Sequence, residues 1–176
     1  MIAAVASGGT LIQPHLLKND TGLKPSYFPL SDDTVRQVTD GMWGVVNEPD
    51  GTTSGLVKLE NIDFSGKTGT AQVESFELQN KLGKKLKENG WFVGLAPRRN
   101  PEIVVAALVQ RGGWGSTSAA PIVRDVVKAY YDKKSGKKDL TYTAKDGKPA
   151  IVPAYGSGPI AVQAQADPVK SDAKDR

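Results

Sequence analysis

Five consecutive residues, Gly66 to Thr70, combine a cation, two hydroxyls and two glycines. Polar and apolar residues alternate on both sides of this segment, and that period predicts a β-strand with a small-residue interruption in its middle. Gly69 leaves room for another backbone or a ligand to come close. Lys67 and the hydroxyls of Thr68 and Thr70 are donors suited to a carboxylate, and an extended strand can pair with an extended peptide. The segment therefore predicts a strand that binds a peptide by its carboxylate end.

Two other interpretations of this segment compete with the first. Thr68-Gly69 would form a simple turn if Lys67 were only a solvated side chain. Gly66-Lys67-Thr68 also matches the end of a phosphate-binding loop, but that pattern needs a glycine where this chain has Asn61, and a helix that begins at the lysine. The glycine and threonine that follow start a helix poorly, so the sequence disfavours nucleotide binding.

Composition limits the remaining function classes. With 176 residues the chain is one domain or part of one. A net charge of +4 without a concentrated basic stripe gives little support to nucleic-acid binding. The chain has no cysteine and a single histidine, His15, so the sequence predicts no disulfide, metal site or cofactor. No apolar run approaches the roughly 20 residues of a membrane span, and Met1 to Val5 lacks the basic start of a signal peptide.

Helices and strands that would position the strand lie on both sides of it. The start of the chain is typical of a helix end, stopped by Gly8-Gly9, and an extended stretch follows. Ser31 predicts the start of a helix from about Asp32 to Val46. Its expected buried stripe consists of Val35, Val38, Met42 and Val45.

The residues after the central strand predict a hairpin and a closing helix. Residues 74–89 are polar, with a short exposed helix expected near 80–87. Two strands, 91–96 and 102–109, form an antiparallel hairpin with both faces largely buried, in which Trp91 and Phe92 are core residues, as is Trp43 in the preceding helix. Arg98-Arg99 is expected to be the solvated tip of this hairpin. After a glycine-rich loop with Trp114, Pro121 begins a helix to about Asp132 whose apolar stripe is Ile122, Val123, Val126, Val127 and Tyr130.

The last quarter of the chain has a different composition. Residues 134–176 are rich in Lys, Gly, Pro, Ala and Asp without a sustained period, which predicts a disordered low-complexity tail. Ser135-x-x-Lys138 and Ser171-x-x-Lys174 match a nucleophile pattern, but a disordered tail cannot hold a catalytic serine rigidly beside its base. The sequence therefore predicts an α+β domain over residues 1–133, with an antiparallel sheet flanked by helices, followed by a tail.

Several stretches of residues 1–133 together resemble the last third of a penicillin-binding transpeptidase domain, of the group that acts in cell elongation. The K-T-G element is one of three motifs shared by these proteins and class A β-lactamases. The resemblance implies the α/β sandwich of the serine β-lactamase and transpeptidase fold. It is carried by Gly8-Gly9-Thr10-Leu11, Pro14-His15-Leu16, Gly41-Met42-Trp43-Gly44-Val45-Val46-Asn47, Gly66 to Val73, Gly90 to Pro97 and Asn100 to Ala106.

This resemblance implies a role for each residue of the strand. Lys67 would supply positive potential for the terminal carboxylate of a D-alanyl-D-alanine stem peptide of peptidoglycan, or of a β-lactam, and the hydroxyls of Thr68 and Thr70 would bind it. The Thr70 backbone N–H would be one of two oxyanion-hole donors. Gly69 would let the substrate backbone approach, and the strand through Gln72 would pair with the peptide.

The chain also departs from the family pattern. The nucleophilic S-x-x-K and the S-x-N motif are absent from residues 1–133, and covalent catalysis needs that activated nucleophile. We expect the chain to be a piece of a longer protein and not to acylate by itself. The missing N-terminal part of the domain would hold the nucleophile, a membrane anchor and two further strands, at the periplasmic face of the bacterial inner membrane beside the glycosyltransferase of the elongation machinery.

Two alternatives remain. A serine β-lactamase or D,D-carboxypeptidase relative shares K-T-G, so this element cannot separate it from a transpeptidase. A catalytically dead module that binds peptides would also keep the strand. With two strands missing, the strand at Ile103 to Val109 would show a long apolar edge, which predicts poor solubility or oligomers. The resemblance also places Trp114 near the opening of the substrate cleft.

Overall fold

The computed structural model describes residues 1–17, 24–73, 75–83, 87–137, 139–143 and 149–153. The described residues form the predicted α+β fold with an antiparallel sheet, whose three strands lie in the order β3–β4–β5. Two small two-stranded sheets accompany it. The elements are α1 (Ile2–Ala6), β1 (Thr10–Leu11), β2 (Ser26–Tyr27), α2 (Asp32–Asn47), β3 (Ser65–Ala71), α3 (Phe76–Leu82), β4 (Asn89–Ala96), β5 (Ile103–Val109), α4 (Gly115–Ser118), α5 (Ala120–Lys134), β6 (Asp139–Thr143) and β7 (Pro149–Pro153).

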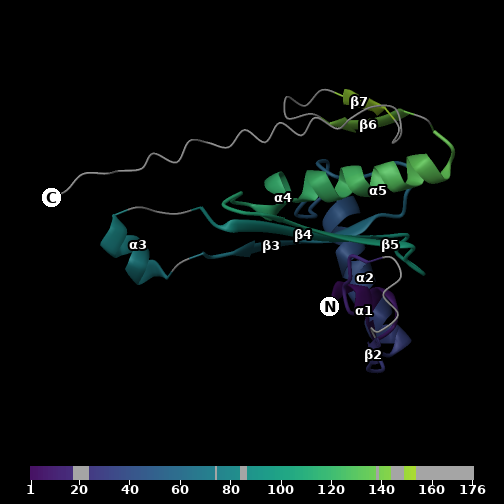
Figure 1. Ribbon diagram of the computed structural model, residues 1–176, viewed down its shortest axis with the longest axis horizontal. Helices are drawn as coiled ribbons and strands as arrows, with labels where there is room; N and C mark the ends of the chain where they lie inside the picture. Colours follow the sequence, from purple (N-terminus) through teal and green to yellow (C-terminus); the bar gives the residue numbers. More distant parts are fainter. Residues whose placement is uncertain (18–23, 74, 84–86, 138, 144–148, 154–176) are drawn as a thin grey trace.

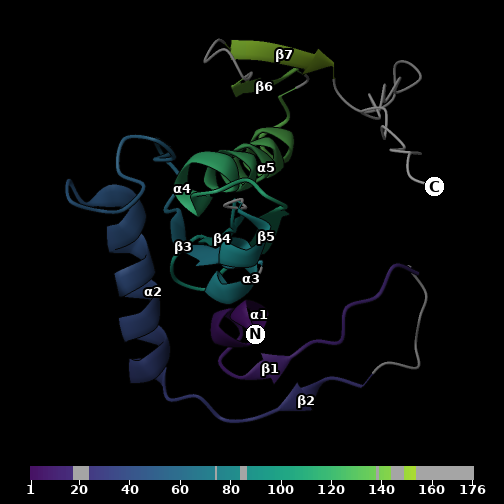
Figure 2. The same ribbon diagram turned by 90° about the vertical axis from the view of Figure 1, so that its left-hand side faces the viewer.

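Helices cover the two faces of the central sheet. Helices α4 and α5 lie on one face and α1 lies on the other, while α2 packs beside β3 (Figures 1 and 2). The core forms mainly between the sheet and α5, where Phe92 of β4 is fully buried against Phe64, with ring centroids 6.3 Å apart. Its other fully buried members are Val46, Val57, Ala96, Ala119, Ala120, Val123 and Val127.

Helix α2 has the predicted start and a different buried face. The Ser31 hydroxyl accepts a hydrogen bond from the Thr34 N–H at 3.1 Å, which satisfies one free donor of the first turn. The predicted stripe is wrong at Val38, whose residue surface is 42% exposed. Met42 is buried as predicted, and Thr39, Gly44 and Val46 are buried in addition. Thr39 tolerates burial because its hydroxyl donates to the Val35 carbonyl oxygen at 2.8 Å.

The predicted burial of β5 and α5 also needs correction. Strand β5 is the edge of the three-stranded sheet and is only half-buried, with Leu108 at 50% exposure, so the hairpin is not buried on both faces. In α5 the buried apolar residues are Ala120, Val123 and Val127, which recur at helical spacing, whereas Ile122 and Val126 are exposed. Both errors arise because apolar type alone does not reveal which side of an element meets a neighbour.

Three further boundaries differ from the predicted ones. Strand β3 is continuous rather than interrupted, because every residue from Ser65 to Ala71 pairs with β4. Helix α3 begins at Phe76 instead of near Asn80. The glycine-rich loop contains a short helix, α4, with Trp114 at its N-cap.

The predicted tail contains structure in its first part. Helix α5 continues to Lys134, and β6 pairs with β7 in an antiparallel hairpin, so these segments are not disordered. Residues 154–176, including Ser171 and Lys174, lie outside the described residues, as does Lys138. The division of the chain at residue 133 stays a prediction. In the part of the chain that the structure describes, no helix has both the length and the apolar character needed to cross a bilayer.

Candidate carboxylate-binding site

The predicted binding residues Lys67 to Thr70 all lie on β3. Because side chains alternate along a strand, Lys67 belongs to one face of the sheet and the two threonines belong to the other. The lysine bends around the strand nevertheless. Its ammonium donates to the Thr68 carbonyl oxygen at 2.8 Å and lies 3.4 Å from the Thr68 hydroxyl. The structure therefore brings the cation and a hydroxyl together at the strand, with Lys67 and Thr70 exposed to solvent.

Glycines allow close packing around this strand. A Cβ atom added to Gly66 would overlap the ring of Phe92, and one added to Gly69 would lie 3.2 Å from the Trp91 Cβ. Gly115, the first residue of α4, sits directly on the sheet: its added Cβ would overlap the Trp91 carbonyl oxygen and lie 2.5 Å from that of Gly69. The backbone that comes close at Gly69 is therefore that of α4, which the sequence alone did not identify.

Gln72 lies outside the strand. Strand β3 and its pairing with β4 both end at Ala71, and Gln72 follows as an exposed residue without regular structure. The structure thus places Lys67, Thr68, Gly69 and Thr70 on one strand and leaves Gln72 just beyond its end.

An apolar hollow of about 800 Å³ borders the candidate site on the α1 side of the sheet. The hollow is lined by Lys67 and Trp91 of the sheet and by apolar residues of α1 and α2. Trp91 is 40% exposed there, so its prediction as a core residue is wrong, while Phe92 is fully buried as predicted. The remaining lining residues are Met1, Ile2, Val5, Gln37, Val38, Gly41, Met42, Val45 and Val93.

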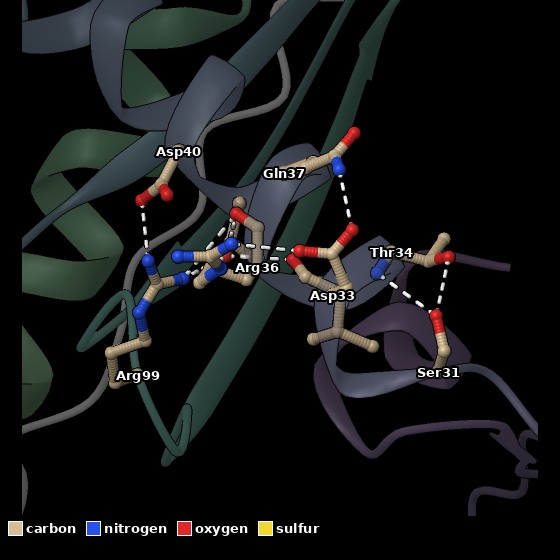
Figure 3. A network of polar contacts seen from close by, with 9 residues as sticks. Ser31, Asp33, Thr34, Arg36, Gln37, Asp40 and Arg99 are labelled. Atoms are coloured by element: carbon tan, nitrogen blue, oxygen red, sulfur yellow. Dashed lines mark hydrogen bonds and ion pairs between the residues drawn. The ribbon is translucent and has the colours of Figure 1, made fainter.

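The tip of the β4–β5 hairpin is held in place by ion pairs, although the Arg99 side chain remains exposed to solvent. The Arg99 guanidinium bonds to the Asp40 carboxylate at 2.6 Å (Figure 3). It also bonds to the Thr39 hydroxyl at 2.6 Å. Arg98 contacts Asp40 at 3.2 Å and stacks over the ring of Trp43, with 5.0 Å to the ring centroid. No local pattern predicts these contacts, because the partners are about 60 residues apart.

Charge at this junction is balanced. The hydrogen bond from Arg99 holds the pKa of Asp40 below its ordinary value of 3.8, and partial burial opposes this effect more weakly. A neighbouring hollow of about 530 Å³ is lined by Arg36, Arg98 and Arg99. Arg36 pairs with Asp33 at 2.7 Å, and Arg98 also contacts Asp63 at 3.7 Å, so the three arginines face three carboxylates and leave no excess of positive charge.

Neither Ser65 nor Ser135 has the surroundings of a nucleophile. Ser65, the first residue of β3, is fully buried, and its hydroxyl has no hydrogen-bond partner. Ser135 ends α5 and donates its hydroxyl to the Asp132 carbonyl oxygen at 2.9 Å. Within the described residues there is also no group of three or more histidine, cysteine or acidic side chains that could hold a metal ion.

Comparison with known proteins identifies relatives of this arrangement. Residues 1–128 match the family model of the penicillin-binding protein transpeptidase domain. The peptidoglycan D,D-transpeptidase MrdA of Haemophilus influenzae is 34% identical over 145 residues, which cover 74% of this chain and 22% of the relative. The chain thus spans less than a quarter of the length of this relative.

Solved structures give the same result. PBP2 of Pseudomonas aeruginosa, in complex with WCK 5153, superposes with a TM-score of 0.59 at 31% identity, covering 84% of this chain and 31% of that one. PBP2 of Helicobacter pylori, in a complex with MreC, superposes with a TM-score of 0.56 at 26% identity, covering 73% of this chain and 23% of that one. The antiparallel sheet with flanking helices is therefore the fold of these domains. This chain belongs to the penicillin-binding protein transpeptidase domain family.

Proposed function

We propose that this chain supplies the carboxylate-binding strand of a peptidoglycan D,D-transpeptidase. The observation that carries the proposal is the Lys67 ammonium, held 3.4 Å from the Thr68 hydroxyl on an exposed strand. A cation and a hydroxyl in this arrangement are donors for the terminal carboxylate of a D-alanyl-D-alanine stem peptide or of a β-lactam. Thr70 adds a second exposed hydroxyl on the same strand.

The same strand would contribute to acyl transfer. In an antiparallel pair, alternate residues of the edge strand direct their N–H and C=O groups away from the partner. The Thr68 carbonyl oxygen accepts a hydrogen bond from the Lys67 ammonium, so the backbone groups of Thr68 point away from β4. Thr70 lies two residues further along the strand, so its N–H and C=O groups point in the same direction. On this proposal the Thr70 N–H would stabilise the oxyanion that forms when a serine attacks the peptide carbonyl, before the terminal D-alanine leaves.

The serine itself must come from outside residues 1–133, in which no serine has a lysine three residues later. We propose that it is carried by a polypeptide segment that covers the apolar hollow beside Lys67, since the family relatives are about four times longer than the matched part and the hollow borders the binding residues. By the same analogy the full assembly would work at the periplasmic face of the bacterial inner membrane, beside the glycosyltransferase of the elongation machinery. An MreC-like partner is supported by the Helicobacter pylori complex.

Direct binding tests the proposal. A peptide that ends in D-alanyl-D-alanine is titrated into the full chain by isothermal calorimetry or by NMR. We expect saturable binding that Lys67→Ala weakens at least tenfold and that Lys58→Ala, a matched exposed lysine, leaves unchanged. The proposal fails if the peptide binds equally well to the Lys67→Ala variant, or if it does not bind to the wild-type chain.

A second candidate, a peptide-binding module without catalysis, is favoured by the absence of the S-x-x-K pattern from residues 1–133. Labelling with a fluorescent penicillin tests whether the chain carries its own nucleophile. We expect no covalent label on the chain alone. A label on any serine would show that the chain carries its own nucleophile and would contradict this expectation.

A further inference from the structure

Asn47, the last residue of α2, is hydrogen-bonded to the backbone where β3 begins. Its side-chain amide nitrogen donates to the Phe64 carbonyl oxygen at 2.9 Å and to the Trp43 carbonyl oxygen at 3.0 Å. Because both acceptors are carbonyl oxygens, the atom between them must be the amide nitrogen. Phe64 immediately precedes Ser65, the first residue of β3. The amide therefore links the end of α2 to the start of the strand that carries Lys67.

Both ends of this hydrogen bond are firmly held. The Val45 carbonyl oxygen in the last turn of α2 accepts hydrogen bonds from the N–H and from the hydroxyl of Thr53, each at 3.0 Å, and Thr53 is fully buried. The side chains of Val46 and Phe64 are fully buried members of the core. The bond from Asn47 thus fixes the distance between two anchored elements at this point.

The Phe64 carbonyl lies on the edge of β3 that faces away from β4. Alternate residues of an edge strand direct their N–H and C=O groups to this side. The Thr68 carbonyl oxygen does so, and Phe64 lies four residues earlier, in the same alternation. Helix α2 packs beside β3 (Figure 2). Asn47 therefore bonds the same edge of the strand that Thr68 and Thr70 would offer to a ligand further along.

The distance between α2 and β3 decides how much room lies beside Lys67. The apolar hollow that Lys67 lines is bounded on its other side by α2, including Met42 and Val45. Asn47 follows Val45 by two residues on the same helix. Loss of its bond to the strand therefore allows this wall of the hollow to tilt relative to Lys67.

We propose that Asn47 is a positioning residue of the β3 site: its hydrogen bond to the Phe64 carbonyl oxygen sets the place of the strand edge beside α2, and with it the fit of a ligand whose carboxylate is held by Lys67 and Thr68. This inference rests on the proposed carboxylate-binding function. Asn47 does not touch the ligand and acts through the backbone of β3.

Calorimetric titration of the full chain with a peptide that ends in D-alanyl-D-alanine tests the inference. We expect Asn47→Ala to weaken binding about tenfold, the upper scale of one lost hydrogen bond. Thr53→Val is the matched control, because it removes a buried hydroxyl from the same helix end without touching Phe64. It should lower the melting temperature and leave the affinity unchanged. Melting curves of all variants ensure that binding is measured on folded chains.

The amide signals of Thr68 and Thr70 in the 15N-labelled chain without ligand give an independent readout. Their N–H groups lie on the edge that Asn47 is inferred to position, so Asn47→Ala should shift both signals. Thr53→Val should leave both signals in place, since the Phe64 carbonyl keeps its donor.

Asn47→Asp separates the donor from the shape of the side chain. At pH 7 its carboxylate has no proton to donate to the two carbonyl oxygens, so binding should be as weak as in Asn47→Ala. These surroundings raise the pKa of the introduced carboxyl above its ordinary value of about 3.9, so that at pH 4.5 it is protonated and donates one hydrogen bond. The ratio of its dissociation constant to that of wild type should then fall toward one, whereas the ratio for Asn47→Ala stays constant.

Other charged groups cancel in this ratio. Glu48 on α2, Asp63 before β3 and Arg98 at the hairpin tip carry charge around the bond and are present in every variant. The ion pair of Asp40 stays intact at pH 4.5, because the pKa of this carboxyl is below 3.8. The terminal carboxyl of the peptide, with a pKa of about 3.5, also remains ionised.

The outcomes separate the inference from the proposed function. If Lys67→Ala weakens peptide binding and Asn47→Ala does not, the inference is wrong and the carboxylate site stands. A Thr53→Val variant that binds as weakly as Asn47→Ala, or a ratio for Asn47→Asp that does not change with pH, also overturns the inference. If the wild-type chain does not bind the peptide, the proposed function fails, and the threonine signals of the free chain still decide whether Asn47 positions the strand.

Discussion

The Arg99 guanidinium lies 2.6 Å from the Asp40 carboxylate and joins the tip of the β4–β5 hairpin to helix α2. Arg98 contacts the same carboxylate at 3.2 Å. The sheet that carries the K-T-G strand is therefore tied to α2 at the end remote from α4. The orientation of β3 depends on contacts at both ends of the sheet.

The Asp40 contacts predict a pH-dependent stability. Arg99 lowers the pKa of Asp40 from 3.8, so the folded state holds this proton less tightly than the unfolded state. The stabilisation is then fully present above the unfolded pKa and is lost as the pH falls through the lower, folded value. We expect Asp40→Asn to lower the melting temperature at pH 7, and the difference from wild type to shrink below pH 4, as measured by circular dichroism. Asp50→Asn, an exposed carboxylate after α2, serves as control. A difference that is constant with pH would rule out the ionic origin.

We expect the buried carboxylate of Asp132, near the end of α5, to contribute more to the free energy of unfolding than Asp40 does. Burial alone would raise the pKa of this carboxyl, but hydrogen bonds from Lys128 and Lys137 outweigh it and lower the pKa. Lys137 lies at 2.8 Å, and the Asp132 side chain is only 9% exposed. We expect Asp132→Asn to destabilise the domain by about 1–3 kcal/mol, as measured by urea unfolding at pH 7. A loss as small as that of the exposed Asp50→Asn variant would show that these hydrogen bonds contribute little.

The backbone around Gly115 leaves no room for a side chain at this position. A methyl group there would overlap the Trp91 carbonyl oxygen, and neither backbone can move without breaking the sheet or α4. We expect Gly115→Ala to destabilise by about 1–3 kcal/mol and to weaken peptide binding, because α4 would shift away from Gly69. In α2, Gly41 has no atom within 4 Å of an added Cβ, so Gly41→Ala should stabilise by up to about 1 kcal/mol. Equal effects of the two substitutions on urea unfolding would contradict the packing of α4 on the strand.

The free edge of β5 predicts self-association. Among the described residues β5 pairs only with β4, and Leu108 on it is 50% exposed. Exposed apolar edge strands of separate molecules pair with one another, and a charged side chain on the edge strand opposes this pairing. We expect the wild-type chain to form oligomers with rising concentration in sedimentation velocity experiments, and Leu108→Lys to reduce them. Leu56→Lys, equally exposed but in a loop, should have no effect. A wild-type chain that stays monomeric at all concentrations would show that the edge is protected.

The sequence by itself determined the local features. Ser31 before two aspartates predicted the start of α2, and the alternation around Lys67 predicted the strand, because a cap and a strand period depend on neighbouring residues. The order α2, β3, β4, β5 and α5, and the choice of residues of the candidate site on β3, also followed from local pattern and from the resemblance of several short stretches to one family. The short helix α4 and the β6–β7 hairpin did not.

Only the tertiary structure decided which faces and which distant residues meet. Val38 and Ile122 have the composition of core residues but are exposed, because the positions of neighbouring elements, not side-chain type, select the buried side of a helix. Arg99 and Asp40 are 59 residues apart in sequence, and Gly115 meets Gly69 across a comparable distance along the chain. Such contacts form only when separate elements pack together, so they cannot be predicted from a local sequence pattern.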